Sequence, residues 1–322
     1  MTGVGAGGVG VLVVGDANPD LLLRGDVVPR FGQAEQLLDS ADLVLGGSAA
    51  IVAAGLARLG VRTALAAVVG HDQFGAFVIE RLSERGVDTS AVTVRDELAT
   101  AVSVVLSQEH DRGILTLPGA IPALDAPAVR AAVDRLRPRH VHFASYFLQP
   151  ALARTLPELL DGLRLSGITT SLDTNWDPAE RWEGLAEVLS RVTWFLPNGE
   201  EAVAIASSVS GRRVVDLDDA GALLSALGCH VVIKAGAAGG LAFEAGIRTA
   251  DAPGLELDVV DTTGAGDSFD AGYLAAMLQG AEAESDRLRW AAVAGSLSVR
   301  GVGGTAAQTT ADELAAANAA NG

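Results

Sequence analysis

The amino-acid sequence predicts an α/β protein, a three-layer sandwich with a mostly parallel central sheet between helices, plus a small β lid. Three observations support this fold class. Short apolar runs rich in β-branched residues alternate with helical patterns along most of the chain. A single hairpin pattern interrupts that alternation. The chain has 322 residues, of which 49% are hydrophobic, so it can bury a large core.

The first hundred residues establish the alternation. VGVLVVG (9–15) is an apolar run that ends at a glycine, which indicates a buried strand. GSAAIVAAGLARLG (47–60) is typical of a small-residue helix with a glycine stop. RTALAAVVG (62–70) is again strand-like, and DQFGAFVIERLSERG (72–86) is an amphipathic helix. Strands and helices in this order predict a parallel sheet wrapped by helices.

The alternation breaks in the segment 99–118. ATAVSVVLS and GILTLPG flank the polar turn QEHDRG, which is a β-hairpin pattern. Together with the segment 21–45, this hairpin would form a second layer over the edge of the sheet. We therefore expect a lid built from about 16–45 and 96–118, on a single domain that spans residues 1–322.

Beyond the hairpin the alternation resumes. RHVHFAS (139–145) and ITTSLD (168–173) are strands around a helix at 150–161. The remaining expected elements follow in chain order: helix 179–191, strand 192–196, helices 199–207 and 218–228, strands 230–236 and 240–246, and helices 264–279, 284–300 and 311–319. No repeat or low-complexity linker separates the two halves, which favours one domain.

Composition excludes several classes of protein. Acidic residues outnumber basic ones, 40 to 23, for a net charge of −17, which argues against a nucleic-acid partner. An acidic protein that handles a polyanion needs a metal ion or backbone dipoles to offset repulsion. Cys229 is the only cysteine, so no intrachain disulfide is possible. With no basic leader and no long apolar run, we expect a cytoplasmic protein with no membrane partner.

Two glycine-rich segments differ in their context. GVGAGG (3–8) has the dinucleotide spacing but precedes the first strand, so we reject it as a cofactor motif. A P-loop is absent too, because the only lysine, Lys234, does not follow the required glycines. DTTGAGDSF (261–269) instead leads directly into a helix. Its glycines let backbone N–H groups gather at the helix start, where they attract phosphate oxygens.

Asp267 lies in the first turn of that helix. A carboxylate beside a transferring phosphoryl group can accept the proton of an attacking hydroxyl. A helix cap would explain Asp267 on its own. The neighbouring glycines favour the catalytic interpretation, because a cap does not require two of them.

Four sequence elements, in the order that the family has them, resemble the ribokinase-like, or PfkB, family of carbohydrate kinases over nearly the whole chain. DTTGAGDSF is similar to the C-terminal signature of that family. GGSAAIVAAGLARLG (46–60) with VVGHDQFG (68–75) resembles its N-terminal signature. LPNGEEA (196–202) is similar to its N-x-x-E element, and VIKAGAAGG (232–240) to its nucleotide-side turn.

The resemblance implies a role for each matching residue. Asp267 would be the catalytic base, and the N–H groups of Gly264, Ala265, Gly266 and Asp267 would form an anion hole. ATP and Mg²⁺ would be the cofactors. The residues implied on the nucleotide side are Asn198 and Glu201 near Mg²⁺ (Glu201 directly or through water), Lys234, Gly236 and Gly239 near ATP, and Asp173 and Asn175 near the transferred phosphate.

On the substrate side the resemblance implies a small sugar as partner. Asn18 and Asp20 would bind its hydroxyls, and Gly46 and Gly47 would bring backbone against it. Ile51 stands where the family usually has an asparagine, so one polar anchor is missing and ribose itself is in doubt.

Further implications concern a cation and a partner chain. The family pattern of a monovalent cation, K⁺, matches six positions: Asp261, Thr263, Ser296, Val299, Gly301 and Thr305. A homodimer through the lid is a further expectation. Two other functions remain open, a nucleoside kinase of the same superfamily and a sugar- or nucleotide-responsive binding protein without turnover. Few aromatics lie near the lid for stacking a base, Phe31 aside, and the intact Asp267 argues against loss of turnover.

Overall fold

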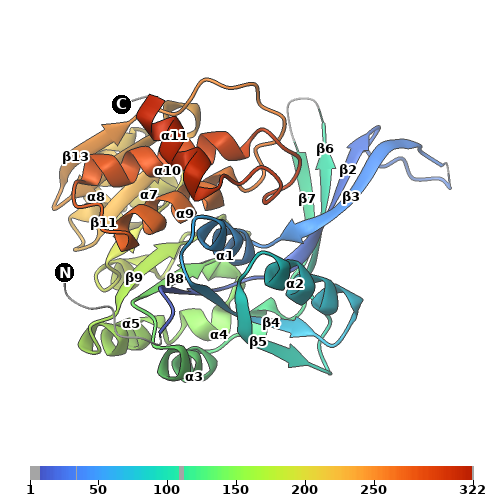
Figure 1. Cartoon of the computed structure of the whole chain (residues 1–322), viewed down its shortest axis with the longest axis horizontal. Coiled ribbons are helices and arrows are strands. Elements are labelled where there is room, and N and C mark those ends of the chain that lie inside the picture. Colours follow the sequence, from blue (N-terminus) through green and yellow to red (C-terminus); the bar gives the residue numbers. More distant parts are fainter. Residues whose placement is uncertain (1–7, 34, 109–111, 321–322) are drawn as a thin grey trace.

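The computed structural model describes residues 8–33, 35–108 and 112–320, and it contains a nine-stranded sheet at the centre of the molecule (Figure 1). From β5 to β11 neighbouring strands are parallel, and β12 and β13 complete one edge in antiparallel fashion. In spatial order the strands are β13 (Ile247–Ala252), β12 (Gly240–Glu244), β11 (His230–Lys234), β10 (Trp194–Phe195), β9 (Thr169–Asp173), β8 (His140–Ala144), β1 (Val11–Val14), β4 (Thr63–Gly70) and β5 (Asp88–Arg95).

Helices cover both faces of this sheet. Alternate residues of β1 enter different cores: Val11 and Val13 pack with one layer of helices, Leu12 and Val14 with the other. The first layer contains α1 (Ser48–Arg58), α2 (Gln73–Glu84), α9 (Ala265–Leu278), α10 (Glu284–Ser298) and α11 (Ala311–Ala320). The second contains α3 (Ala126–Leu136), α4 (Pro150–Ala153), α5 (Leu156–Leu165), α6 (Leu185–Leu189), α7 (Gly199–Ser210) and α8 (Leu217–Ser225). The predicted three-layer α/β sandwich is therefore confirmed.

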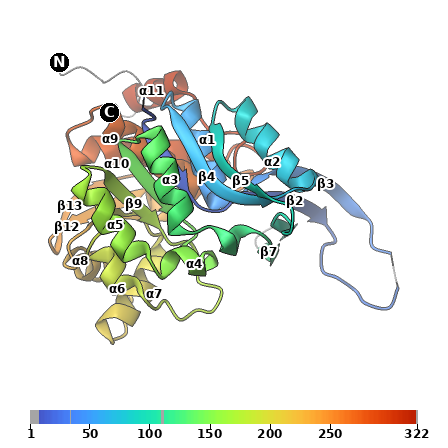
Figure 2. The ribbon, with the colours of Figure 1, turned by 90° about the horizontal axis from the view of Figure 1, so that it is seen from below.

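A second, four-stranded sheet projects from one end of the body (Figures 1 and 2). Its order is β3 (Leu38–Gly46), β2 (Asn18–Gly25), β6 (Val102–Ser107) and β7 (Arg112–Leu117). β2 pairs parallel with β6, and both outer pairs are antiparallel. Both segments expected to form the lid supply strands to this small sheet.

Some predicted boundaries were wrong. The helix expected over 179–191 begins only at Leu185, because the Asp177 carboxylate accepts hydrogen bonds from the N–H groups of three following residues, Ala179, Arg181 and Trp182. Trp182 also has a left-handed backbone, with φ of 55°. The helix expected over 150–161 is two helices, α4 and α5. The strands β5 and β13 and the helix α3 were not predicted.

Two sequence predictions fall partly outside the described residues. The GVGAGG segment lies there except for Gly8, as do residues 109–111 of the hairpin turn. Within the residues that the structure describes, none of the helices is both long enough and apolar enough to cross a bilayer.

Candidate active site

The DTTGAGD segment forms a turn that opens at the N-terminus of α9. Gly264 is the N-cap residue, with φ of 72°, and a Cβ there would lie 2.6 Å from the Cα of Gly304. Only glycine tolerates both the left-handed backbone and this close approach. Ala265 N–H donates to the carbonyl of Thr262 (3.2 Å), whereas the first-turn amides of Gly266 and Asp267 have no intrahelical acceptor. The turn thus presents backbone donors at the positive end of a 14-residue helix.

Asp267 is buried at this helix terminus, with 9% of its surface exposed. Its carboxylate accepts a hydrogen bond from the Ser48 hydroxyl at 2.5 Å. Burial raises the pKa of Asp267 to about 7, and the bond from Ser48 opposes that rise. A carboxylate with a pKa near neutrality is suited to accept a proton from a hydroxyl. Ser48 begins α1, so this contact joins the N-termini of two helices.

Polar residues at the end of β1 and the start of β2 lie beside Ser48. The Asp16 carboxylate accepts hydrogen bonds from the N–H groups of Ser48 (3.1 Å) and Ala49 (3.0 Å), which caps α1. Asn18 donates to Asp20 (2.8 Å) and to Ser103 of β6 (3.3 Å). Burial, together with the negative charge of Asp16, raises the pKa of Asp20 to about 7. This cluster lies where the chain passes from β1 of the central sheet to β2 of the small sheet.

The two glycines of the N-terminal signature lie against the same cluster. A Cβ on Gly46 would lie 2.1 Å from the Asp20 carboxyl carbon. Gly47 has φ of 84°, and its Cβ would lie 2.9 Å from the carbonyl oxygen of Asp16. Larger residues at these positions would therefore displace the aspartates.

Ile51 is buried in α1, and its side chain is directed at Gly304. A Cβ on Gly304 would lie 2.5 Å from the Ile51 Cδ1 atom, and Gln308 donates to the Ile51 carbonyl (2.9 Å). Ile51 therefore supports the loop that packs on Gly264, and it offers no polar side-chain group at this place.

Lys234 lies at the end of β11, in a buried ion cluster. Its ammonium contacts Asp173 of β9 at 2.6 Å and Asp270 of α9 at 3.1 Å. Burial lowers the pKa of Lys234, but Asp173 and Asp270 outweigh burial and raise it on balance. Burial raises the pKa of Asp270 well above its ordinary value, whereas Lys234 overcomes the effect of burial and lowers the pKa of Asp173. The cluster thus sets one buried lysine against two buried carboxyl groups, and the effect of Lys234 on the pKa is strong enough at Asp173 to outweigh burial.

The cluster lies directly beneath the turn. A Cβ on Gly266 would lie 3.8 Å from the Lys234 ammonium nitrogen. Asn175, which follows Asp173, has φ of 53°, and its side-chain oxygen accepts from the N–H (2.8 Å) and hydroxyl (3.1 Å) of Ser145. Asn175 therefore orders the loops after β8 and β9.

Asn198 and Glu201 form a capping box at the start of α7. The Asn198 side chain accepts from the Glu201 N–H, and the Glu201 carboxylate accepts from the Asn198 N–H, both at 2.9 Å. The backbones of Asn198 and Lys234 pair as a parallel bridge, so Glu201 lies near the ion cluster. Burial raises the pKa of Glu201 to about 7, and Asp173 adds to the effect.

Within residues 8–33, 35–108 and 112–320, no group of three or more His, Cys, Asp or Glu side chains is arranged to hold a metal ion by itself. A Mg²⁺ ion near Glu201 would therefore need phosphate oxygens and water as further ligands, which is how this ion is commonly held in kinases.

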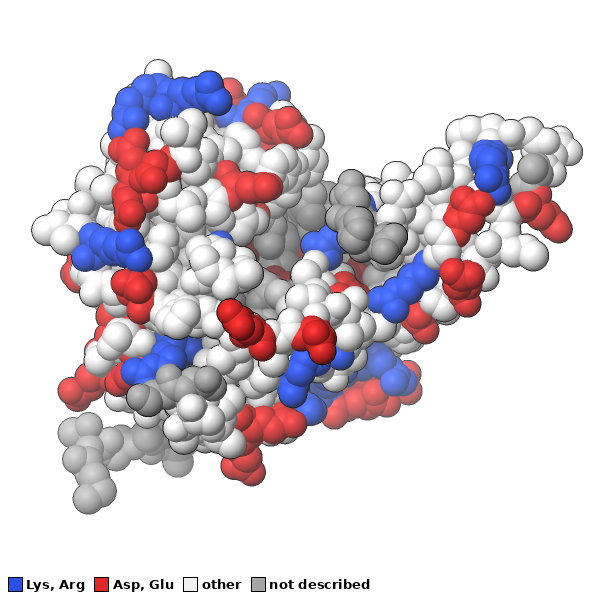
Figure 3. All heavy atoms as spheres, turned by 90° about the horizontal axis from the view of Figure 1, so that it is seen from above, with Lys and Arg blue, Asp and Glu red and all other residues white. Residues whose placement is uncertain are grey.

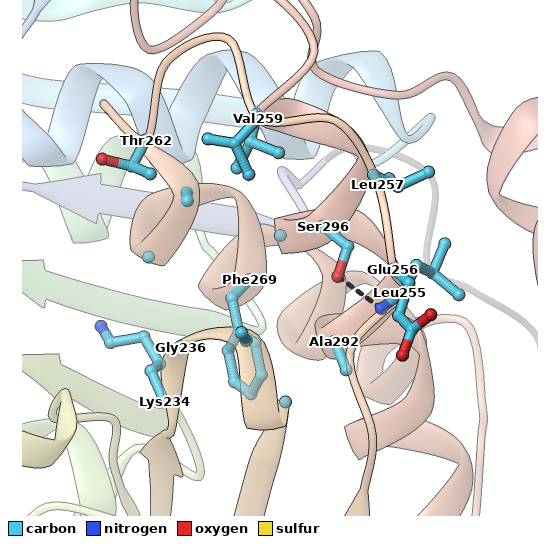
Figure 4. Close-up of a pocket in the computed structure, with 16 residues that line it drawn as sticks. Lys234, Gly236, Leu255, Glu256, Leu257, Val259, Thr262, Phe269, Ala292 and Ser296 are labelled. Atoms are coloured by element: carbon cyan, nitrogen blue, oxygen red, sulfur yellow. Dashed lines mark hydrogen bonds between the residues drawn. The ribbon is translucent and has the colours of Figure 1, made fainter. Parts of the chain in front are cut away.

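A cavity of about 460 Å³ lies on the side of the turn away from the polar cluster of Asp16, Asn18 and Asp20 (Figure 4). Lys234 and Gly236 lie at one end of it, and Leu255, Leu257 and Phe269 give it apolar walls (Figure 4). Gly239 also lines it. Gly239 has φ of 90°, and its Cβ would lie 2.0 Å from the carbonyl oxygen of Ala252. The volume and the mixed lining fit a nucleotide-sized ligand.

Three of the six residues considered for a monovalent cation, Asp261, Thr263 and Val299, are linked by hydrogen bonds. The Asp261 carboxylate accepts from the N–H groups of Thr263 and Gly303, both at 2.9 Å, and the carbonyl of Val299 accepts from the N–H of Asp261 (3.1 Å). Ser296 instead lines the nucleotide-sized cavity, where its hydroxyl accepts from the Leu255 N–H (2.9 Å) (Figure 4). Gly301 and Thr305 belong to the loop beside Asp261.

Sequence reasoning missed four polar residues of this site. Ser48 contacts Asp267, Asp16 caps α1, Ser103 contacts Asn18, and Asp270 pairs with Lys234. Ser48 and Asp16 adjoin segments already singled out, so proximity to those segments was an available signal. The pairing of Asp270 depends on a contact over 36 residues, which no local pattern shows.

A family model for pfkB carbohydrate kinases matches residues 10–311. The chain belongs to the pfkB family of carbohydrate kinases. Its resemblance to that family, and the prediction of a carbohydrate kinase, are thereby confirmed.

Individual relatives are similar over most of this kinase. It is 32% identical to an ATP-dependent ribose-1-phosphate kinase of Halopiger xanaduensis, over 96% of this chain and 97% of the relative. It is 28% identical to a 2-dehydro-3-deoxygluconokinase of Bacillus subtilis, over 84% and 85%. The structure of Arabidopsis thaliana ribokinase with ribose and ATP superposes with a TM-score of 0.79 at 25% identity, over 97% of this chain and 99% of the other.

Proposed function

We propose that this kinase transfers the γ-phosphoryl group of ATP to a hydroxymethyl group of a small carbohydrate, with Asp267 as the general base. One observation carries the proposal. A buried carboxylate with a pKa near 7 lies at an open helix N-terminus, between a polar cluster and a nucleotide-sized cavity. The amides of residues 264–267 stabilise the charge that develops on the transferred group.

The acceptor sugar binds on the side of Asp16, Asn18 and Asp20. Carboxylate and amide groups suit polyols, because each accepts or donates paired hydrogen bonds. Gly46 and Gly47 leave room for these side chains, and Ile51 shapes an apolar border. The 16–45 and 96–118 segments close over the sugar as a lid on a single domain, which excludes water and limits hydrolysis of ATP.

ATP occupies the cavity next to Gly236 and Gly239, with its phosphates directed to the turn at 264–267. Glu201 and Asn198 would hold Mg²⁺ through water near the phosphates. Lys234 and Asp173 act from beneath the turn, and Asn175 keeps the neighbouring loop in place. When bound, the metal ion offsets the repulsion between the triphosphate and a chain of net charge −17.

A K⁺ ion beside the loop of Asp261, Gly301 and Thr305 would add positive charge near the anion hole. We expect turnover measured in K⁺ to fall when K⁺ is replaced by tetramethylammonium at equal ionic strength. Equal rates in the two salts would contradict the site.

The substitution Asp267→Asn tests the central proposal. It removes the proton acceptor and keeps the shape of the side chain, so kcat should fall roughly 1000-fold or more. Binding of ATP, measured by calorimetry, should change little, which separates loss of chemistry from loss of fold. Asp219→Asn, on the surface at α8, is the matched control. Turnover near the unmodified rate in Asp267→Asn would overturn the assignment of the base.

The outer face of the small sheet supports a proposal of a lid-to-lid homodimer. Its register places an apolar row across all four strands, and Leu43 and Leu115 of that row are 44% and 62% exposed. The row consists of Leu43, Leu21, Val104 and Leu115. A second copy would cover these side chains and the edge of β7.

The buried single cysteine, Cys229, is consistent with the cytoplasmic location that we propose.

A further inference from the structure

The inner face of the small sheet, opposite the face that carries Leu43 and Leu115, is turned towards the active-site loop. The pairing of its strands groups the side chains of this face into rows. Residues that pair directly across strands project to the same face. Across β2, β6 and β7 the row nearest the body is polar, the next is apolar and the outermost carries two arginines: Asp20–Ser103–Thr116, Leu22–Val105–Ile114 and Arg24–Ser107–Arg112. On β3 these rows continue with Val44, Asp42 and Ser40.

Both arginines of the outer row reach across to the segment just before the anion hole. Arg24 pairs with the Asp261 carboxylate at 3.5 Å. Among the contacts of Arg112 is a hydrogen bond to the Thr263 hydroxyl at 2.9 Å. The Thr263 hydroxyl in turn donates to Asp261 at 2.7 Å. Two guanidinium groups thus converge next to Gly264, and Figure 3 shows basic side chains in the hollow between the body and the projecting sheet.

The arginines lie on the acceptor side of the site. Neither is among the residues that line the nucleotide-sized cavity. Arg112 instead acts on Asp20: burial and Asp16 raise the pKa of Asp20, and the charge of Arg112 opposes them. Asp20 and Arg24 are four residues apart on β2, roughly 13 Å along the strand. Long arginine side chains and a substrate the size of a pentose phosphate together span that distance.

The residue types match an anionic group. Hydroxyls of a neutral sugar are served by the inner row, in which the Asp20 carboxylate accepts hydrogen bonds and the Ser103 and Thr116 hydroxyls both donate and accept. A guanidinium has only donors, in a planar fork that matches phosphate or carboxylate oxygens. A chain of net charge −17 repels an anionic substrate, so local cations are required where one binds.

We propose that the acceptor is an anionic carbohydrate, a sugar phosphate or a sugar acid, and that Arg24 and Arg112 bind its anionic group. This inference rests on the carbohydrate kinase function proposed above. The arginines act as specificity-determining residues: they bind the part of the acceptor that does not react, and this orients the reacting hydroxyl towards Asp267.

The test compares acceptors that differ in charge. For the unmodified enzyme, kcat/KM should be roughly 100-fold higher with ribose 1-phosphate or 2-dehydro-3-deoxygluconate than with ribose, and the better of the two anions identifies phosphate or carboxylate. In the double variant Arg24→Gln/Arg112→Gln, kcat/KM for that anion should fall roughly 100-fold, while the value for ribose changes less than about threefold. Arg30→Gln, on the exposed loop after β2, is the matched control.

A binding measurement accompanies the kinetics. Calorimetry without ATP should show that the double variant loses affinity for the favoured anionic sugar by a similar factor. Equal losses for ribose and the anion, a preference for ribose in the unmodified enzyme, or an increase only in KM for ATP would each overturn the proposal. Absence of turnover with every acceptor would contradict the proposed kinase function. Even then, loss of anionic-sugar binding in the double variant would support the arginine subsite.

Discussion

At the scale of single residues, Asp267 shows how environment rather than residue type produces a usable base. An exposed aspartate has a pKa near 3.9 and is a weak proton acceptor at pH 7. Burial raises the pKa of Asp267 to about 7, whereas the Ser48 hydroxyl acts in the opposite direction. The deprotonated form is the active base, so kcat/KM should fall as pH drops below about 7.

The substitution Ser48→Ala tests this balance. It removes the hydrogen bond that favours the charged carboxylate, so the pKa of Asp267 rises and the acidic limb of the pH–rate profile moves to higher pH by roughly one unit. Burial also raises the pKa values of Asp20 and Glu201 to about 7, so the acidic limb of the profile reflects the titration of all three carboxyl groups. Ser83→Ala, at an exposed position of α2, should leave the acidic limb at the same pH. An unmoved limb in Ser48→Ala would refute the role of the contact.

At the scale of elements, the ion cluster of Lys234, Asp173 and Asp270 ties α9 to two strands of the sheet. Since Asp267 and Asp270 lie on the same helix, one turn apart, the cluster helps to set the position of the base. The lysine has carboxylate partners on both sides, which makes it a structural member of the site as well as part of the cavity wall.

We expect Lys234→Met to destabilise the protein by about 3–5 kcal/mol, because Asp173 would stay buried without its partner. Adding Asp173→Asn removes the unpaired charge and should restore most of the lost stability, measured by chemical denaturation. The exposed pair Arg212–Asp219 provides the control: Arg212→Met should cost less than about 1 kcal/mol. Failure of the double variant to recover stability would show that the cluster is not held by this charge balance.

At the scale of the whole molecule, the small sheet has two faces with different chemistry. One face looks onto the active-site loop and carries the rows of Asp20, Leu22 and Arg24. The other carries the apolar row of Leu43, Leu21, Val104 and Leu115. A lid that both covers a substrate and pairs with a second copy would couple assembly to the shape of the substrate site.

The homodimer is tested by Leu115→Lys, which places a charge at the β7 end of the apolar row. The unmodified protein should have twice the mass of the chain by light scattering, and the variant should shift towards monomer. Leu165→Lys, on α5 and 83% exposed, introduces the same charge elsewhere and should leave the mass unchanged. A monomeric unmodified protein would rule out the proposed dimer.

Much of this protein was predictable from local patterns. Strands such as β1 and β4 are continuous apolar runs, and helices such as α2 and α9 have a clear start and stop, because those signals depend on near neighbours in the chain. The antiparallel edge strand β13 was missed, since its exposed residues have no apolar alternation. The helix expected from residue 179 failed because the Asp177 side chain competes for the backbone N–H groups that a helix start needs.

The sequence by itself determined the α/β class, the segment that forms the anion-binding turn, and the family, because each is written in contiguous residues. Only the tertiary structure decided which side chains meet: Ser48 with Asp267 across 219 residues, Lys234 with Asp173 across 61, and Arg112 with Thr263 across 151. Such contacts depend on how strands and helices pack. A pattern along the chain depends on neighbouring residues only, so it does not show which residues far apart in the sequence meet.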